Sequence, residues 1–259
     1  MKPFITAIQT EWLKMKKSKV IWLTTAAFTI APLMAGFFMI VLKDPDMAKN
    51  AGFISTKAQI AGEATWPSYL NLYAQIIAVG GIFVFGFVNS WIFGREYADN
   101  TIKDLLALPY PRAVIVLAKF VTSFTISFIL SAYIVTLGFL IGWMIDLPQW
   151  SSLVVMEALY SIIIVTLLTI ALSTPVAFFA CYSQGYLAPL GFVIVTLVFS
   201  QIIAAAGFGA YFPWAIPALY SGVTEGSQSL HLSSLLIVLI ISVLGIISTM
   251  YHWLFADQH

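Results

Sequence analysis

The sequence predicts an all-α polytopic membrane protein with six transmembrane helices, and three observations support this fold class. The chain has 259 residues, of which 61% are hydrophobic and only 9% are charged, whereas a soluble domain carries about 25% charged residues. The few charges are separated by long uncharged intervals. Strict alternation of apolar and polar residues, which is typical of a membrane β-barrel, is missing from the sequence. The spans are therefore helices, because a helix satisfies its own backbone hydrogen bonds in lipid.

The uncharged intervals predict where the spans lie. Five intervals contain 23, 31, 26, 67 and 31 residues, and a helix needs about 20 apolar residues to cross the bilayer core. The interval of 67 residues is long enough for two crossings, and the polar segment 181–185, with Pro175 before it and Pro189 after it, marks the break between them. The predicted spans are about 20–42, 69–93, 113–144, 153–180, 187–206 and 232–254.

The distribution of lysine and arginine predicts that both termini are cytoplasmic. With the N-terminus inside, the inner segments hold nine of these residues and the outer segments hold three, as the positive-inside rule requires. Lysines before the first apolar stretch also occur in signal peptides, but this stretch exceeds the usual 7–15 apolar residues of such a peptide. We therefore expect an uncleaved, multi-pass chain that forms one transmembrane domain over residues 1–259.

Residues 2–19 predict an amphipathic helix at the inner membrane surface. Ile5, Ile8, Trp12 and Met15 recur at helical spacing, and the segment becomes basic toward its end. A helix of this kind lies in the membrane interface. Two interpretations remain open: the helix anchors the chain and sets its topology, or it also contacts a cytoplasmic partner.

The segment 94–112, between the second and third spans, gathers six of the chain's 23 charges. Asp99 or Asn100 is expected to cap a short helix there, and Pro109 and Pro111 are expected to end it. Its apolar side would consist of Ile102, Leu105, Leu106 and Leu108. An ordinary ordered loop is the simpler interpretation, but a capped amphipathic helix followed by two prolines favours a docking surface for a partner.

The segment 207–222 is expected to form a short broken or re-entrant element at the outer interface. It contains Pro213, Trp214 and Pro217 within five residues. Aromatic residues are common at any membrane interface, so the paired prolines are the more informative feature.

Motifs for chemistry within the chain are missing from the sequence. It contains no P-loop pattern, no H-E-x-x-H and no G-x-S-x-G, which disfavours an intramembrane enzyme. Glu157 and Lys119 lie near span ends and are expected to reach the interface by snorkelling. A stand-alone secondary transporter requires internal repeats and polar residues at the midplane, and neither is visible. Gly138 and Gly142 form one G-x-x-x-G packing pattern.

The segment from Phe93 to Lys119 resembles the cytoplasmic loop of type-2 ABC exporter permeases. The residues that carry the resemblance are Glu96, Thr101, Leu105, Leu106, Pro109, Arg112 and Lys119. Asn100 stands where the family often has glycine. The segments 11–18 and 213–217 are also similar to the corresponding parts of these permeases, and the small permeases of bacitracin-export and lantibiotic-immunity systems are the most similar group.

The resemblance implies a permease subunit, not an enzyme, that moves an amphipathic substrate out of a bacterial cell or its cytoplasmic membrane. ATP and Mg would bind two separate ATPase subunits, and a second copy or a paralogous permease would complete the pathway. The implied ATPase-coupling residues are Glu96, Thr101, Ile102, Lys103, Leu105, Leu106, Pro109 and Arg112. The implied interface-helix residues are Glu11, Trp12, Lys14 and Lys17, and the outer element would use Pro213, Trp214 and Pro217. A peptide antibiotic such as bacitracin or a lantibiotic and a lipid-like compound are equally compatible substrates. The chain's net charge of +1 gives no support for a nucleic-acid partner.

Overall fold

The computed structural model describes residues 2–44, 63–107, 109–222 and 231–255. Every regular element in these ranges is helical, which confirms the all-α fold class. The long helices are α2 (Lys19–Lys43), α5 (Trp66–Ala98), α7 (Arg112–Met144), α8 (Ser152–Leu172), α10 (Leu187–Ala205) and α12 (Leu232–Phe255). The shorter ones are α1 (Lys2–Lys17), α6 (Ile102–Leu106), α9 (Thr174–Tyr182) and α11 (Ile216–Tyr220), with 3-10 turns at Gly209–Tyr211 and Pro213–Ala215.

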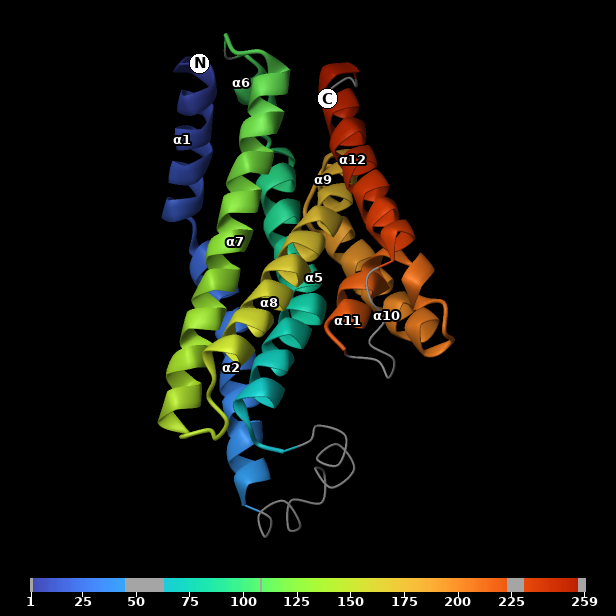
Figure 1. The fold of residues 1–259 in the computed structure, drawn as a ribbon. Helices are drawn as coiled ribbons and strands as arrows, with labels where there is room; N and C mark the ends of the chain where they lie inside the picture. The colour runs from blue at the N-terminus through green and yellow to red at the C-terminus, as the bar shows by residue number, and fades with distance from the viewer. Residues whose placement is uncertain (1, 45–62, 108, 223–230, 256–259) are drawn as a thin grey trace.

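Six helical segments in the described part of the chain are long and apolar enough to cross a membrane, as the sequence predicts. The fourth span combines α8 and α9 over Ser152–Tyr182. The helices α5 and α7 contain 33 residues each, so each is about 50 Å long at 1.5 Å per residue. This exceeds a hydrocarbon core of about 30 Å, so the two helices project beyond it. Figure 1 shows α6, which joins them, at the same end of the molecule as both termini.

The helix α5 forms the centre of the bundle. Within its most apolar stretch, 67% of the residues are buried inside the protein. In the other spans of the described part of the chain, the corresponding share is at most 33%. It packs against α2, α7, α8, α9 and α10. The side chains of Tyr69, Ile77, Phe85 and Phe93 are completely enclosed. The predicted second span ends at residue 93, but α5 continues to Ala98 because Glu96, in its last turns, pairs with Lys119 inside the protein.

A buried polar contact joins three spans. The Asn89 side-chain amide on α5 donates to Ser173 Oγ at 2.6 Å, and Ser123 Oγ on α7 donates to Asn89 Oδ1 at 2.9 Å. Ser173 lies where α8 ends and α9 begins, with Pro175 in the first turn of α9. The network therefore holds the break in the fourth span against the central helix.

The two glycines of the G-x-x-x-G pattern pack α7 against α5 of the same chain. Gly138 lies against the ring of Tyr73, and a Cβ at Gly142 would be 2.6 Å from the ring of Trp66. The Tyr69 hydroxyl donates to the Gly138 carbonyl at 3.2 Å. Both glycines are used in a contact that a larger side chain would obstruct.

The segment 207–222 forms the two 3-10 turns and α11. It contacts α8, α10 and α12. Pro217 is buried, and the ring of Trp214 packs edge-on against Phe192 with centroids 5.5 Å apart. Figure 1 shows α11 well short of the level that α2 and α7 reach at the end away from the termini.

Candidate functional site

The turn between α5 and α6 is set by Asn100. Its φ of 55° lies in the left-handed region, which asparagine and glycine tolerate best. The Thr101 N–H donates to the Glu96 carbonyl at 2.9 Å and the Asn100 N–H to the Tyr97 carbonyl at 3.1 Å, which is the Schellman pattern. Asn100 therefore ends α5. The expectation that Asn100 or Asp99 caps the following helix was wrong: Thr101 occupies that position and makes no side-chain cap.

The helix α6 has only five residues, Ile102–Leu106. The segment 94–112 was expected to hold this helix, with Leu108 on its apolar side; Leu108 lies outside the described residues. Ile102 is 3% exposed and Leu105 is half-buried against the core, so this side of α6 faces the bundle. The outward side consists of Lys103, Asp104 and Ala107, all exposed, which we call the exposed α6 face. Pro109 and Thr101 are exposed beside it.

Four charged side chains meet beneath α6 and form what we call the ion-pair cluster: Glu11 and Lys14 from α1, Glu96 from α5 and Lys119 from α7. Lys119 Nζ lies 2.9 Å from Glu96 Oε1 and 3.3 Å from Glu11 Oε2. Lys14 Nζ lies 2.6 Å from Glu11 Oε1 and 3.0 Å from Glu96 Oε1. Lys119 also donates to the Ile92 carbonyl at 2.8 Å. Two cations thus balance two carboxylates and link three helices.

Lys119 is completely buried (0% exposed), so the expectation that it reaches the interface by snorkelling was wrong. The two carboxylates explain this, because a lysine can remain in the interior when opposite charges replace its water. Glu157 is exposed, in contrast. Glu96 is 4% exposed and points into the bundle, away from the exposed α6 face. The expectation of almost no buried charge was therefore wrong, because Glu11, Glu96 and Lys119 are all buried.

The helix α1 packs against α7, and Figure 1 draws it beside the half of α7 nearest the termini. Its inward side carries Glu11 and Met15, which are 6% and 2% exposed. Ile5 and Trp12, expected on the same apolar side as Met15, are exposed. The residues of the expected interface helix therefore divide: Glu11 and Lys14 belong to the ion-pair cluster, whereas Trp12 and Lys17 face outward. The carboxylate of Glu11 turns toward Lys119, and this ion pair fixes how α1 is rotated about its own axis.

The end of α12 closes the other side of the cluster. Trp253 is fully buried, donates its indole N–H to Cys181 Sγ at 3.1 Å and has its ring centroid 6.0 Å from Lys119 Nζ. Arg112 Nη1 donates to the Trp253 carbonyl at 3.2 Å. Arg112 thus binds the last turn of α12, whose carbonyls lack partners within the helix. Sequence reasoning did not identify Trp253. The sequence did offer a signal for Lys119, because a lysine inside a predicted span marks a functional site by default.

These observations define a class of protein. It is a multi-pass helical membrane bundle whose two longest helices, α5 and α7, are joined by a short helix with an exposed polar face. Within the described residues, no group of three or more His, Cys, Asp and Glu side chains could hold a metal ion.

Comparison with known proteins identifies the family. The profile of the family described as ABC-2 family transporter protein matches residues 7–202, which is more than half of the chain. The chain therefore belongs to the ABC-2 transporter family. It is an ABC transporter permease, a multi-pass membrane protein whose family works with an ABC ATPase subunit. It is 26% identical over 189 residues, 73% of this chain and 90% of the relative, to the bacitracin transport permease protein BCRB of Bacillus licheniformis.

Proposed function

We propose that this chain is the membrane subunit of an ATP-driven exporter in a bacterial cytoplasmic membrane, with both termini cytoplasmic. Two partner ATPase subunits bind ATP and Mg, and a second permease, identical or paralogous, completes the transport pathway. The observation that carries the proposal is the exposed α6 face, which lies beyond the membrane core on two projecting helices and is fixed from beneath by buried ion pairs.

The ion-pair cluster suits α6 to the transmission of movement. Glu96 lies in the last turns of α5, and its two lysine partners belong to α1 and α7. A partner that displaces α6 therefore moves α1, α5 and α7 together, because the ion pairs connect these three helices; the displacement is not absorbed by a flexible loop. The ATPase changes the permease conformation to the extent that it binds the inward-open and outward-open states with different affinity.

The substrate is an amphipathic compound that is moved outward. Similarity to a bacitracin transport permease supports a peptide antibiotic, and a lantibiotic or a lipid-like compound has the same chemistry. A stand-alone secondary transporter receives no support from the buried charges, because Glu11, Glu96 and Lys119 gather at the α6 end and not at the midplane.

The docking role of α6 is tested by exchanging its two exposed charges. The double substitution Lys103→Glu/Asp104→Lys leaves the net charge unchanged and touches no buried residue. We expect co-purification of the ATPase to fall at least about tenfold, since hydrogen bonds of charged groups contribute roughly 1.5–3 kcal/mol. Substitution of Leu105 is less informative, because this side chain is half-buried against the core and its loss also destabilises the fold.

The matched control is Glu157→Lys, a charge reversal at an exposed position of α8 away from α6. It should retain the ATPase fully. Undiminished ATPase binding by the α6 variant, with the protein still inserted in the membrane, would show that the exposed α6 face is not the docking surface.

A further inference from the structure

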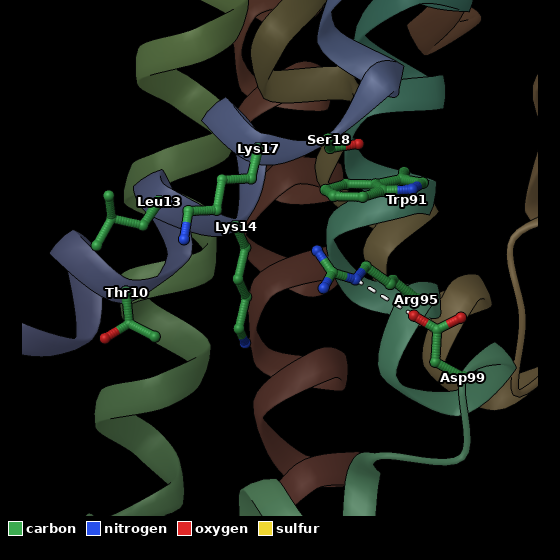
Figure 2. A pocket seen from close by; sticks show the side chains of 8 residues that line it. All are labelled: Thr10, Leu13, Lys14, Lys17, Ser18, Trp91, Arg95 and Asp99. Atoms are coloured by element: carbon green, nitrogen blue, oxygen red, sulfur yellow. Dashed lines mark hydrogen bonds and ion pairs between the residues drawn. The ribbon is translucent and has the colours of Figure 1, made fainter.

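A cavity of about 500 Å³ lies between the α1–α2 junction and the end of α5. It is lined by Lys14 and Lys17 of α1, by Trp91 and Arg95 of α5 and by Ser18 between α1 and α2. Figure 2 shows the guanidinium of Arg95 directed toward α1, whereas the ammonium group of Lys17 lies on the far side of Lys14 from Arg95. The guanidinium of Arg95 lies 4.9 Å from the Trp91 ring centroid. The cavity therefore combines cationic donors, a hydroxyl and an amphipathic aromatic ring.

The charge of this cavity is not fully balanced. Lys14 belongs to the ion-pair cluster, where the carboxylates of Glu11 and Glu96 offset it together with Lys119. Arg95 has one contact with Asp99, at 3.4 Å, and Asp99 is largely exposed. Lys17 forms no ion pair with the described residues. One positive charge is left over, which matches the single negative charge of a phosphodiester.

The cavity lies at the depth of lipid headgroups. The 25 residues of α2, Lys19–Lys43, are about 37 Å long at 1.5 Å per residue, which lies between the hydrocarbon thickness and the full thickness of a bilayer. Ser18, Lys17 and the start of α2 are therefore at one membrane surface. Trp91 on α5 faces the same cavity, and tryptophan is enriched at this level.

A second, apolar groove of about 450 Å³ lies between α2, α5 and α10. It is lined by Leu23, Ala27 and Phe28 of α2 and by Gly80 and Phe87 of α5, with Leu190 of α10. Phe87 lies one helical turn from Trp91, so the groove and the polar cavity share a face of α5. From Arg95 to Gly80 the helix rises about 22 Å, close to the depth of one leaflet with its headgroups.

We propose that the cavity and groove together bind one anionic phospholipid, with its phosphate at Lys17 and Arg95 and an acyl chain along α2 and α5. The bound lipid connects α1 to α5 on the side that α7 does not cover, and so supports the ion-pair cluster from outside. The proposal rests on the orientation given under the proposed function, because anionic lipids attract basic residues at the cytoplasmic surface. It does not depend on the ATPase.

The test is native mass spectrometry of the delipidated permease, titrated with phosphatidylglycerol or with phosphatidylcholine of identical chains. Wild-type protein should prefer phosphatidylglycerol. Lys17→Gln/Arg95→Gln should weaken its binding by roughly twenty-five-fold, since each basic group near a surface contributes about fivefold. The control Lys16→Gln/Lys103→Gln removes two exposed charges that do not line the cavity and should leave lipid binding unchanged. The proposal would be overturned if the wild-type protein bound the two lipids with equal affinity, or if the two double variants bound phosphatidylglycerol with equal affinity.

The acyl-chain part is tested with Ala27→Phe, which fills the groove, against Ala26→Phe, an exposed neighbour outside it. Only Ala27→Phe should weaken phosphatidylglycerol binding.

Two other outcomes would assign the site to a different ligand. If inorganic phosphate displaces the lipid and Ala27→Phe has no effect, the site binds a soluble anion and the lipid proposal is wrong. If Ala27→Phe separates permease copies, or the charge variant releases the ATPase while lipid binding persists, the surface belongs to a protein partner and the proposal is also wrong. The orientation is read separately by cysteine labelling.

Discussion

Lys119 is the most constrained side chain of the candidate site. Its ammonium group is fully buried and receives its oxygen partners from α1 and α5: Glu11, Glu96 and the Ile92 carbonyl. A buried ion pair adds little stability relative to apolar residues of the same size, but the loss of one partner is costly because the other charge stays buried without compensation. Lys119 therefore specifies how α1, α5 and α7 fit together.

Replacing Lys119 by methionine should lower the free energy of unfolding by about 3–5 kcal/mol. Two carboxylates would then share one partly exposed lysine, Lys14. Adding Glu96→Gln should recover much of the loss, since it removes one uncompensated charge. Thermal unfolding in detergent measures the stability of the single and the double variant. Lys103→Met, at an exposed position, is the control. Additive effects of the two substitutions would contradict the direct interaction.

The contact between α9 and α12 shows how a helix break is used. Thr174 Oγ1, in the first turn of α9, donates to the Ser242 carbonyl of α12 at 3.0 Å. Gly245 lets α12 approach this turn closely, because a Cβ there would lie 2.6 Å from the Pro175 backbone nitrogen. Since α9 carries Cys181 and α12 carries Trp253, this packing positions the residues that close the ion-pair cluster.

Gly245→Val should therefore destabilise the protein by about 1–3 kcal/mol, because the obstructing atoms are rigid backbone. Gly191→Val is the matched control: Gly191 is also helical, on α10, and nothing lies within 4 Å of its Cβ position. We expect the midpoint of thermal unfolding to fall for Gly245→Val and to stay the same or rise for Gly191→Val. Equal midpoints would mean that α12 can shift freely against α9.

The short elements differ in how far they could be predicted. Charge density and paired prolines located a structured turn in the segment 94–112, but the helix there has five residues, and Asn100 ends the helix before it. Asparagine suits both a helix N-cap and a left-handed C-terminal position. The choice depends on how far α5 continues, and α5 continues to Ala98 because Glu96 has lysine partners on other helices.

Both termini and α6 lie at one end of the molecule (Figure 1). This arrangement follows from an even number of crossings, whereas the lysine and arginine bias predicts that this end is cytoplasmic. The projecting ends of α5 and α7 then extend on the side where ATP is available.

A cysteine at Lys103 should stay protected from an impermeant thiol reagent in intact cells, and one at Ser152 should react. Both positions are exposed. Lys103 lies in α6, at the end of the bundle that holds the termini, and Ser152 is the first residue of α8, toward the opposite end. Background labelling should be low because Cys181, the single cysteine of the chain, is fully buried. Reaction of both in permeabilised cells provides the control, and the reverse pattern in intact cells would invert the topology.

The number of spans and their approximate positions follow from the sequence, because hydropathy and charge act over consecutive residues that a bilayer sorts by depth. The partners of Lys119 do not follow from it. Glu11 is 108 positions away, and nothing in the spacing distinguishes a lysine that meets two carboxylates from one that reaches water. Only the packing of α1 against α7 brings these groups together, and the energy of a buried charge depends on what surrounds it in three dimensions. The rotation of α1 about its own axis and the burial of Glu96 follow from that contact.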